Sequence, residues 1–290
     1  MISPDRLAVI ANIQEKVASG AFNDKVENGD PTLDEEGVRK ALYRVVKERD
    51  SIPYGIKHFI ARRIADMLTF RLAKGAEVKG LENIKDVKGA AIVTSNHFAP
   101  FENGMLRIMT SKNGKGHLWA VSQDTNFVMK GWRGFLLRYA GLIPVTQDKG
   151  FMATFFEQML GEQLGKGHYV LIYPEQEMWF NYRKPRPPKR GAYHYAAKFG
   201  VPVISCFVEI DDVPGVGSDG IGNTRWILHI LPTIWPDPRK SVRENSVAMM
   251  EQDYAQKCQA YEKAYGKALD YVFEKWDVAG YEQGLQVQNI

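Results

Sequence analysis

Hydrophobic residues follow two different spacings along this chain. Between residues 76 and 240, short apolar or β-branched runs alternate with segments of helical periodicity. That alternation is typical of an α/β fold, here a largely parallel mixed sheet flanked by helices. The expected strands cover residues 90–95, 118–122, 142–146, 169–173, 202–209 and 225–231. The expected helices between them cover residues 102–112, 131–140, 151–165 and 188–199.

The regions on both sides of this domain have helical periodicity. Residues 1–75 form the expected N-terminal helical region, residues 76–240 the α/β domain, and residues 241–290 a helical C-terminal tail. The tail pattern extends to about residue 276 and predicts one long helix. In the segment 54–74, apolar residues recur every four positions, at Ile56, Ile60, Ile64, Leu68 and Leu72.

Two interpretations of the helix 54–74 remain open. Cations lie beside its apolar row, at Lys57, Arg62, Arg63, Arg71 and Lys74. A helix of this composition fits the surface of an anionic bilayer. Packing of the apolar row against the rest of the protein produces the same pattern and is the more frequent outcome.

Composition restricts the function classes. The hydrophobic content of 44%, the charged content of 25% and the net charge of +4 are those of an ordinary globular protein. Lysine and arginine are not clustered as in nucleic-acid-binding proteins. Two cysteines indicate a reducing compartment. Neither a signal-peptide core nor an apolar run of about 18 residues is present, so we expect a cytoplasmic protein with at most peripheral contact with the inner face of the membrane.

Polar residues follow the strand 90–95 abruptly, in the stretch "SNHFAPFENG". Asn96 and His97 end the strand, and Glu102 lies five residues after His97. Pro100 disfavours a continuous helix here, so a sharp turn is expected that brings Glu102 within hydrogen-bonding reach of His97. Such a carboxylate orients an imidazole that acts as a base. A structural or helix-capping histidine is the alternative.

A second polar cluster, Tyr173-Pro174-Glu175, ends the strand 169–173. Together the two clusters resemble the glycerolipid acyltransferase superfamily, which includes the 1-acylglycerol-3-phosphate acyltransferases. Its first motif, Asn-His-x4-Asp, is matched by Asn96, His97 and Glu102, with Glu for Asp. Its third motif, Phe-Pro-Glu-Gly-Thr-Arg, is matched at 173–175 only, and the resemblance covers roughly residues 76–235.

The resemblance implies a glycerol-3-phosphate acyltransferase-like fold and transfer of an acyl group from a thioester to the hydroxyl of a lyso-lipid. His97 would be the general base, oriented by Glu102, while Asn96 and Glu175 would contact the substrate. Acyl-CoA or acyl-acyl carrier protein would be the co-substrate, and no metal or other cofactor is expected. A non-catalytic lipid-binding relative and an acyl-thioester hydrolase remain alternatives.

The departures from the family pattern concern phosphate recognition. The second and third motifs place arginines where Gln147 and Met178 stand here. We therefore expect a phosphodiester or glycolipid acceptor to be used better than lysophosphatidate. A basic run follows, as either a phosphate clamp or a solvated loop, at Arg183, Lys184, Arg186, Lys189 and Arg190. Three aromatic residues just before it line a substrate channel or belong to the core, the more frequent case: Trp179, Phe180 and Tyr182.

Other sites are not supported by the sequence. The chain contains no Gly-x-Ser-x-Gly motif, which disfavours an α/β-hydrolase. The stretch "GVGSDG" at 215–220 precedes an expected strand rather than a helix, which disfavours a dinucleotide site. No histidine lies at zinc-ligand spacing with cysteines or acids.

Overall fold

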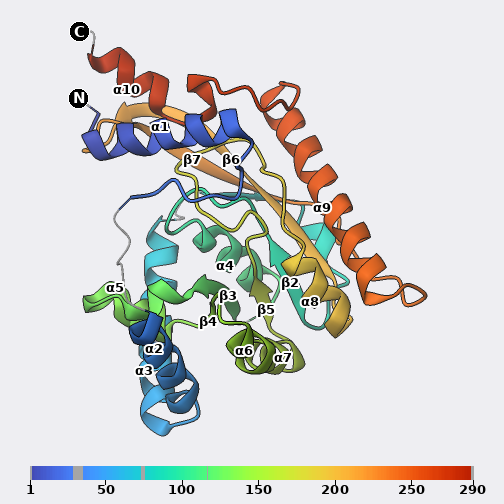
Figure 1. Cartoon of the computed structure of the whole chain (residues 1–290). Helices are drawn as coiled ribbons and strands as arrows, with labels where there is room; N and C mark the ends of the chain where they lie inside the picture. Colours follow the sequence, from blue (N-terminus) through green and yellow to red (C-terminus); the bar gives the residue numbers. More distant parts are fainter. Residues whose placement is uncertain (1, 29–34, 73–75, 116, 289–290) are drawn as a thin grey trace.

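A mixed seven-stranded sheet forms the centre of the molecule in the computed structural model, which describes residues 2–28, 35–72, 76–115 and 117–288 (Figure 1). The strand order is β1-β7-β6-β2-β5-β3-β4. Neighbouring strands are parallel except β6 and β7, which form an antiparallel pair. The strands are β1 (Glu77–Lys79), β2 (Ala91–Thr94), β3 (Leu118–Gln123), β4 (Leu142–Val145), β5 (Tyr169–Leu171), β6 (Val203–Val216) and β7 (Gly222–Ile230).

The helices lie on both faces of this sheet and at its ends (Figure 1). They include α1 (Pro4–Ser19), α2 (Glu35–Glu48), α3 (Ile52–Leu72), α4 (Asn103–Lys112), α5 (Gly131–Tyr139), α6 (Lys149–Phe151), α7 (Glu157–Gly165), α8 (Gly191–Phe199), α9 (Val242–Tyr265) and α10 (Tyr281–Gln288). Shorter helical segments are η1 (Leu81–Ile84), η2 (Asp124–Val128), η3 (Met152–Phe156) and η4 (Lys275–Asp277). The predicted α/β class with helical regions at both ends is confirmed.

The six predicted strands are present, and β1 was not predicted because three residues carry too little periodicity. The predicted C-terminal helix to residue 276 is wrong after residue 265, over about its last third. Helix α9 begins at the side-chain cap of Ser241 and ends at Gly266, whose left-handed φ of 63° terminates it. Residues 267–274 then run without helical structure. The predicted end of helix 54–74 falls in residues 73–75, outside the described residues.

Alternating side chains of the central strands build two cores, one on each face of the sheet. Val93 of β2 belongs to the core beneath α4, with Phe98 and Leu106. Ile92 points to the other face and packs with residues of α7, α8 and α9. A strand with both faces covered must be apolar throughout, as the fully buried β2 is.

A third core joins distant parts of the chain. Helix α1 packs against Val278 near the C-terminus and against aromatic residues between β5 and α8. Those aromatics are Trp179, Phe180 and Tyr182, which are 0%, 7% and 2% exposed and therefore have the core role that was the more frequent alternative. This core crosses both predicted region boundaries; the division at residues 75 and 240 itself stays a prediction.

Helix α3 packs on α4 and α5 along one side and leaves apolar side chains exposed on the other. Its exposed large apolar residues are Ile52, Ile56, Phe59, Ile60 and Met67. Within the described ranges, no helix is both long and apolar enough to cross a membrane.

Candidate active site

The predicted site residues lie where the parallel strands end. The turn after β2 carries His97, and the segment after β5 carries Tyr173 and Glu175. Because β2 and β5 are parallel neighbours, with Val93 opposite Leu171, their carboxyl ends meet at the same edge of the sheet. Ligands of open α/β sheets bind at this edge. We call residues 95–102 the His97 turn and residues 174–190 the 174–190 loop.

The His97 turn has the predicted fold-back. Residues 99–102 form a turn, and α4 begins at Asn103, three residues after Pro100. The fold-back brings Oε1 of Glu102 into a short hydrogen bond with Nδ1 of His97. Glu102 is 1% exposed, whereas the His97 side chain is 21% exposed. The carboxylate is therefore buried and the imidazole is open to solvent.

The hydrogen bond determines which nitrogen is available for chemistry. A carboxylate can only accept, so Nδ1 of His97 carries the proton and Nε2 has the free lone pair. A buried carboxylate in this position fixes the ring orientation and stabilises the imidazolium that forms when Nε2 takes a proton. The arrangement has the geometry of a base and its orienting acid.

Tyr173 lies against the imidazole, a contact that sequence reasoning missed. The two rings are stacked, with 3.9 Å between centroids and 9° between planes. Burial, with the nearby charge of Glu102, raises the pKa of Tyr173 well above its usual 10. The phenol therefore keeps its proton at neutral pH. The only sequence signal was position, because Tyr173 lies two residues after β5, the strand beside β2.

Asn96 joins the His97 turn to β6. Its side-chain amide donates to the carbonyl of Val208 at 3.0 Å, and its Oδ1 accepts from the backbone N–H of the same residue at 2.8 Å. The side chain thus takes the place of a backbone peptide group and continues the hydrogen bonding to β6 beyond the end of β2. Its predicted contact with substrate stays a prediction.

Glu175 is 3% exposed and forms an internal ion pair. Its carboxylate accepts from Nε and the backbone N–H of Arg186, at 3.1 and 2.9 Å, and from the backbone N–H of His97 at 3.2 Å. Arg186 is 2% exposed, and burial lowers its pKa although Glu175 opposes the shift. Glu175 therefore acts in the structure as the point where the 174–190 loop attaches to the His97 turn. Its predicted contact with the acceptor stays a prediction.

Two cations of the basic run are buried in ion pairs with distant segments. Arg183 pairs with Asp212 at 2.7 Å, and Lys184 pairs with Asp277 at 2.9 Å. Lys184 also donates to Asp270 at 3.1 Å. Neither the phosphate clamp nor the solvated loop describes these two side chains as they lie here. Their predicted role in substrate binding stays a prediction.

The other predicted residues lie on the surface. Lys189 and Arg190 are exposed just before α8, and Gln147 is exposed just after β4. Met178 is partly buried in the 174–190 loop. Of the predicted set, the structure therefore brings together Asn96, His97, Glu102 and Glu175, while the four cations either pair elsewhere or face solvent. Among the described residues, no group of three His, Cys, Asp or Glu side chains is placed to hold a metal ion.

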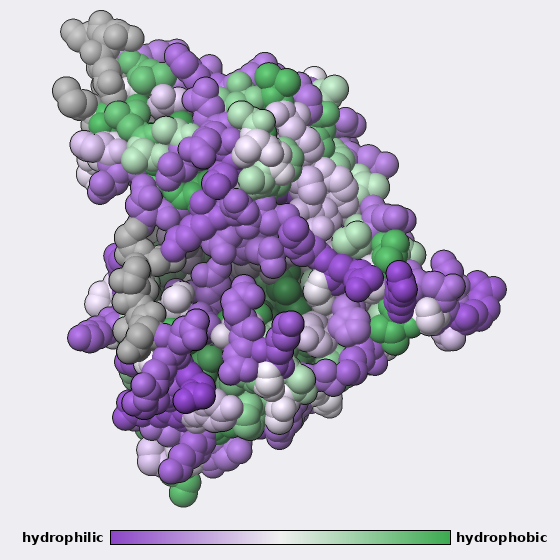
Figure 2. Space-filling view, viewed as in Figure 1, coloured by the Kyte–Doolittle hydropathy of each residue, from purple (hydrophilic) through white to green (hydrophobic). Residues whose placement is uncertain are grey.

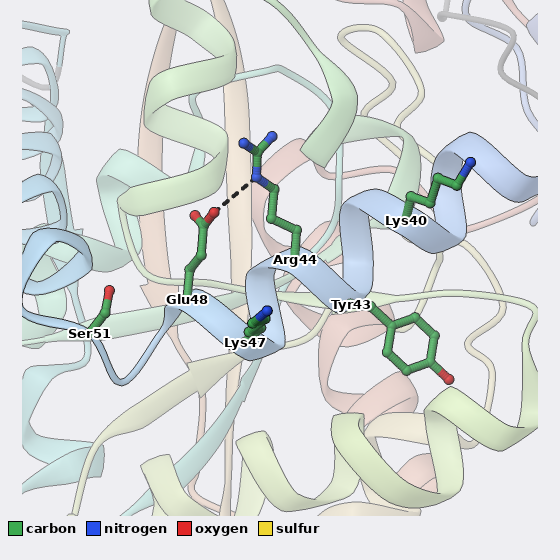
Figure 3. A pocket seen from close by; sticks show the side chains of 6 residues that line it. All are labelled: Lys40, Tyr43, Arg44, Lys47, Glu48 and Ser51. Carbon is green, nitrogen blue, oxygen red and sulfur yellow. Dashed lines mark hydrogen bonds and ion pairs between the residues drawn. The ribbon is translucent and has the colours of Figure 1, made fainter.

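Two surface hollows differ in their relation to this site. One of about 490 Å³ lies along α2; its side chains, including Tyr43 and the Arg44–Glu48 pair, come from α2 and the residue Ser51 that follows (Figure 3). It contains none of the predicted site residues. The other, of about 290 Å³, adjoins the His97 turn. It is lined largely by apolar residues, including Ala99, Pro100, Phe101, Phe180, Ile221 and Trp226.

One face of the molecule is mixed in character. In Figure 2 most of the face is hydrophilic, and a hollow in its middle has hydrophobic residues at its floor. A ligand with one polar and one apolar part fits such a surface better than a purely ionic one.

A family model matches part of this chain. A family model described as Acyltransferase matches residues 75–209. This match spans slightly less than half of the chain and includes both motifs that carry the resemblance to the glycerolipid acyltransferases.

Two known proteins are similar to this chain. The chloroplastic 1-acyl-sn-glycerol-3-phosphate acyltransferase BAT2 of Brassica napus is 27% identical over 186 residues, 59% of this chain. The match spans 49% of that relative's length, about half. The crystal structure of the 1-acyl-sn-glycerophosphate acyltransferase PlsC from Thermotoga maritima superposes with a TM-score of 0.50 at 15% identity. It covers 92% of this chain and 98% of the other, and shows that the fold is shared.

Proposed function

We propose that this protein transfers a fatty acyl group from a thioester donor to the hydroxyl of a lysophospholipid-like acceptor, with His97 as the general base. The observation that carries the proposal is the His97–Glu102 contact at the carboxyl edge of the sheet, with the carboxylate buried and the imidazole exposed. The acyltransferase family match and the names of the similar proteins support the same reaction class.

The reaction balances without a metal or cofactor. Nε2 of His97 removes the proton of the acceptor hydroxyl as its oxygen attacks the thioester carbonyl. Glu102 stabilises the imidazolium through Nδ1–H. Collapse of the tetrahedral intermediate forms the ester and breaks the carbon–sulfur bond. The thiolate of the CoA or carrier-protein donor then takes the proton from His97 and leaves as a thiol.

An assay of thiol release separates this proposal from its alternatives. The purified protein is mixed with acyl-CoA, or with acyl-acyl carrier protein, in the presence and absence of a panel of lyso-lipids. Thiol release that requires an acceptor, and that the His97→Ala variant lacks, supports the transferase. Release without an acceptor would indicate a hydrolase. Binding of lipid with no release from either donor would indicate a non-catalytic relative.

The acceptor in this proposal has a head group other than a phosphate monoester. A dianion in a partly desolvated site needs paired cations. Arg183 and Lys184 are already paired with Asp212 and Asp277, so they do not replace the family arginines at Gln147 and Met178 without breaking buried ion pairs. The structure thus supports the expectation drawn from the sequence. The exposed Lys189, a few positions further along the chain, is therefore the cation to test as a replacement for those arginines.

Specificity constants test this part of the proposal. We expect a higher kcat/KM for a phosphodiester or glycolipid lyso-acceptor than for lysophosphatidate with the same acyl chain. Lys198→Gln is the control, because Lys198 is a second exposed lysine, near the end of α8. A preference for lysophosphatidate that is lost in Lys189→Gln and kept in Lys198→Gln would show that Lys189 binds a phosphate monoester.

We also propose that α3 is the peripheral membrane contact. Its exposed apolar residues include Ile52, Ile56 and Phe59, which are 82%, 58% and 64% exposed. Exposed cations accompany them at Lys57, Arg63 and Arg71. Arg62 does not belong to this surface, since it is 6% exposed. Thr69 of α3 lies beside Gly104 at the start of α4, so the same helix reaches the neighbourhood of the His97 turn.

Vesicle sedimentation tests the membrane contact. Binding to anionic vesicles should weaken in high salt and in the Arg63→Glu variant, and should weaken further in Phe59→Ser. Leu7→Ser, which removes an exposed apolar side chain of α1, is the matched control. Equal binding of wild type, Phe59→Ser and Leu7→Ser would contradict the assignment of α3.

A further inference from the structure

We infer that the ring of Tyr173 is a positioning residue for His97, one that favours the protonated form of the imidazole during acyl transfer. This inference rests on the proposed function of His97. It starts from the stacked contact, with 3.9 Å between ring centroids and 9° between planes. Such a contact covers one face of the imidazole and leaves its edge nitrogens available.

The stack adds a constraint that the hydrogen bond to Glu102 does not supply. One hydrogen bond at Nδ1 allows the imidazole to swing about the bond axis. A parallel ring against its face fixes the remaining tilt, and therefore fixes the direction of Nε2. Tyr173 is itself held, because it packs against the core beneath α4 and its carbonyl accepts from the N–H of Gln176 at 3.1 Å.

The charge of the imidazole determines when the contact is strongest. Two neutral aromatic rings gain little from parallel overlap, because their quadrupoles repel. A cation over an aromatic face is attracted by the same quadrupole. His97 becomes a cation only as it takes the hydroxyl proton. The contact is therefore stronger in the transition state than in the ground state, which raises kcat and leaves KM nearly unchanged.

The ring, rather than the hydroxyl, carries this effect. The Tyr173 hydroxyl is buried close to Glu102, the charged group with the largest effect on its pKa. Phenylalanine at this position removes only this neighbour of Glu102 and keeps the whole stacking face. Leucine keeps an apolar side chain of similar bulk but has no aromatic face.

The experiment compares Tyr173→Phe with Tyr173→Leu in the full chain. Tyr173→Leu should lower kcat about tenfold while KM changes less than about threefold, and Tyr173→Phe should restore kcat to within about threefold of wild type. Tyr169→Phe is the matched control, because Tyr169 lies on β5 and its hydroxyl bonds Asn113 and Val87 instead of the site. It should leave kcat unchanged.

Histidine-labelled protein gives a readout that does not depend on activity. The ring protons of His97, assigned by their loss in His97→Ala, should show an aromatic ring-current shift in wild type and Tyr173→Phe that disappears in Tyr173→Leu. An unchanged shift, or an unchanged kcat, in Tyr173→Leu would overturn the inference. Equal loss of kcat in both variants would assign the effect to the hydroxyl and overturn it too. If wild type showed no acyl transfer, the proposed function would fail, while the spectrum would still report the stack.

Discussion

The His97 turn and the 174–190 loop lie against each other at one edge of the sheet, yet they are held in different ways. The His97–Glu102 pair joins residues five positions apart, through a turn that starts directly after a buried strand. The 174–190 loop depends on both ends of the chain. Near the N-terminus, the carbonyl of Asp24 accepts a hydrogen bond from the indole N–H of Trp179 at 2.8 Å. Near the C-terminus, the carbonyl of Asp277 accepts one from the backbone N–H of Arg183 at 2.9 Å.

The 174–190 loop also holds the His97 turn in place through hydrogen bonds to its backbone. The backbone N–H of His97 donates to Glu175, and its carbonyl accepts from the N–H of Trp179 at 3.0 Å. Asn181 donates its N–H to the carbonyl of Phe98 at 2.9 Å. The difference teaches that the chemistry at this site is local in sequence, whereas its rigidity is supplied by residues at the two ends of the chain.

The largest expected effect separates chemistry from support. His97→Ala should lower acyl transfer by about 10³-fold or more, near the upper range for a positioned acid–base group. The protein should still fold, but its melting temperature should fall, because the buried Glu102 loses its hydrogen-bond partner. Turnover and thermal unfolding are measured on the same preparation. Wild-type turnover in this variant would refute the proposed mechanism.

Breaking the support should have the opposite signature. Arg186→Met removes the cation that Glu175 faces in a fully buried position, and leaving one charge of such a pair unpaired costs about 3–5 kcal/mol. Urea unfolding measures the loss. Arg225→Gln is the control, because its pair with Asp211 is exposed and should leave the unfolding midpoint unchanged. A midpoint for Arg186→Met equal to that of the control would show that the loop does not depend on this pair.

The same comparison shows what could be predicted from the sequence. The strands that position the site were found because buried parallel strands read as short continuous apolar runs. The His97–Glu102 contact was found because Pro100 restricts a short segment to a turn. The partners of Arg183 and Lys184 could not be found, because Asp212 and Asp277 are 29 and 93 positions away and nothing in a basic run specifies which carboxylate it meets.

The orienting carboxylate should contribute less than the base. Glu102→Gln should lower kcat by about 10²-fold, because an amide can still accept from Nδ1–H but does not stabilise the imidazolium with a charge. Glu102→Asp, which restores the family residue, should recover part of that loss. Steady-state kinetics at saturating acceptor measure both variants. Equal activity of wild type and Glu102→Gln would mean that the pair is structural.

A second group of histidines should control the pH dependence of stability. His117 and His168 lie 5.3 Å apart between ring centroids. Burial, with the nearby charges of His117 and Lys166, lowers the pKa of His168 to about 4. Because the unfolded chain then binds more protons than the native state, stability falls as the pH decreases from about 6.5 toward 4. Burial also lowers the pKa of His58, in the same direction.

Thermal unfolding between pH 7.5 and 4.5 tests this origin. The His168→Gln variant cannot titrate at this position, and its amide can still bond Gln163, the present partner at 3.1 Å. Its melting temperature should fall less steeply with decreasing pH than that of wild type. Parallel curves for the two proteins would rule out His168 as a contributor.

The smallest effect concerns the backbone of the 174–190 loop. Gln176 has a φ of 68°, in the left-handed region, at the position where the third family motif has glycine. A side chain there costs about 1–2 kcal/mol, while glycine loses about 0.5–1 kcal/mol more entropy on folding than a residue with a Cβ. Gln176→Gly should therefore stabilise the protein by up to about 1 kcal/mol, as measured by urea unfolding. Gln158→Gly makes the same substitution on an exposed face of α7 and should destabilise by about 1 kcal/mol instead. If both variants lost stability equally, the left-handed conformation of Gln176 would not be a source of strain in the 174–190 loop.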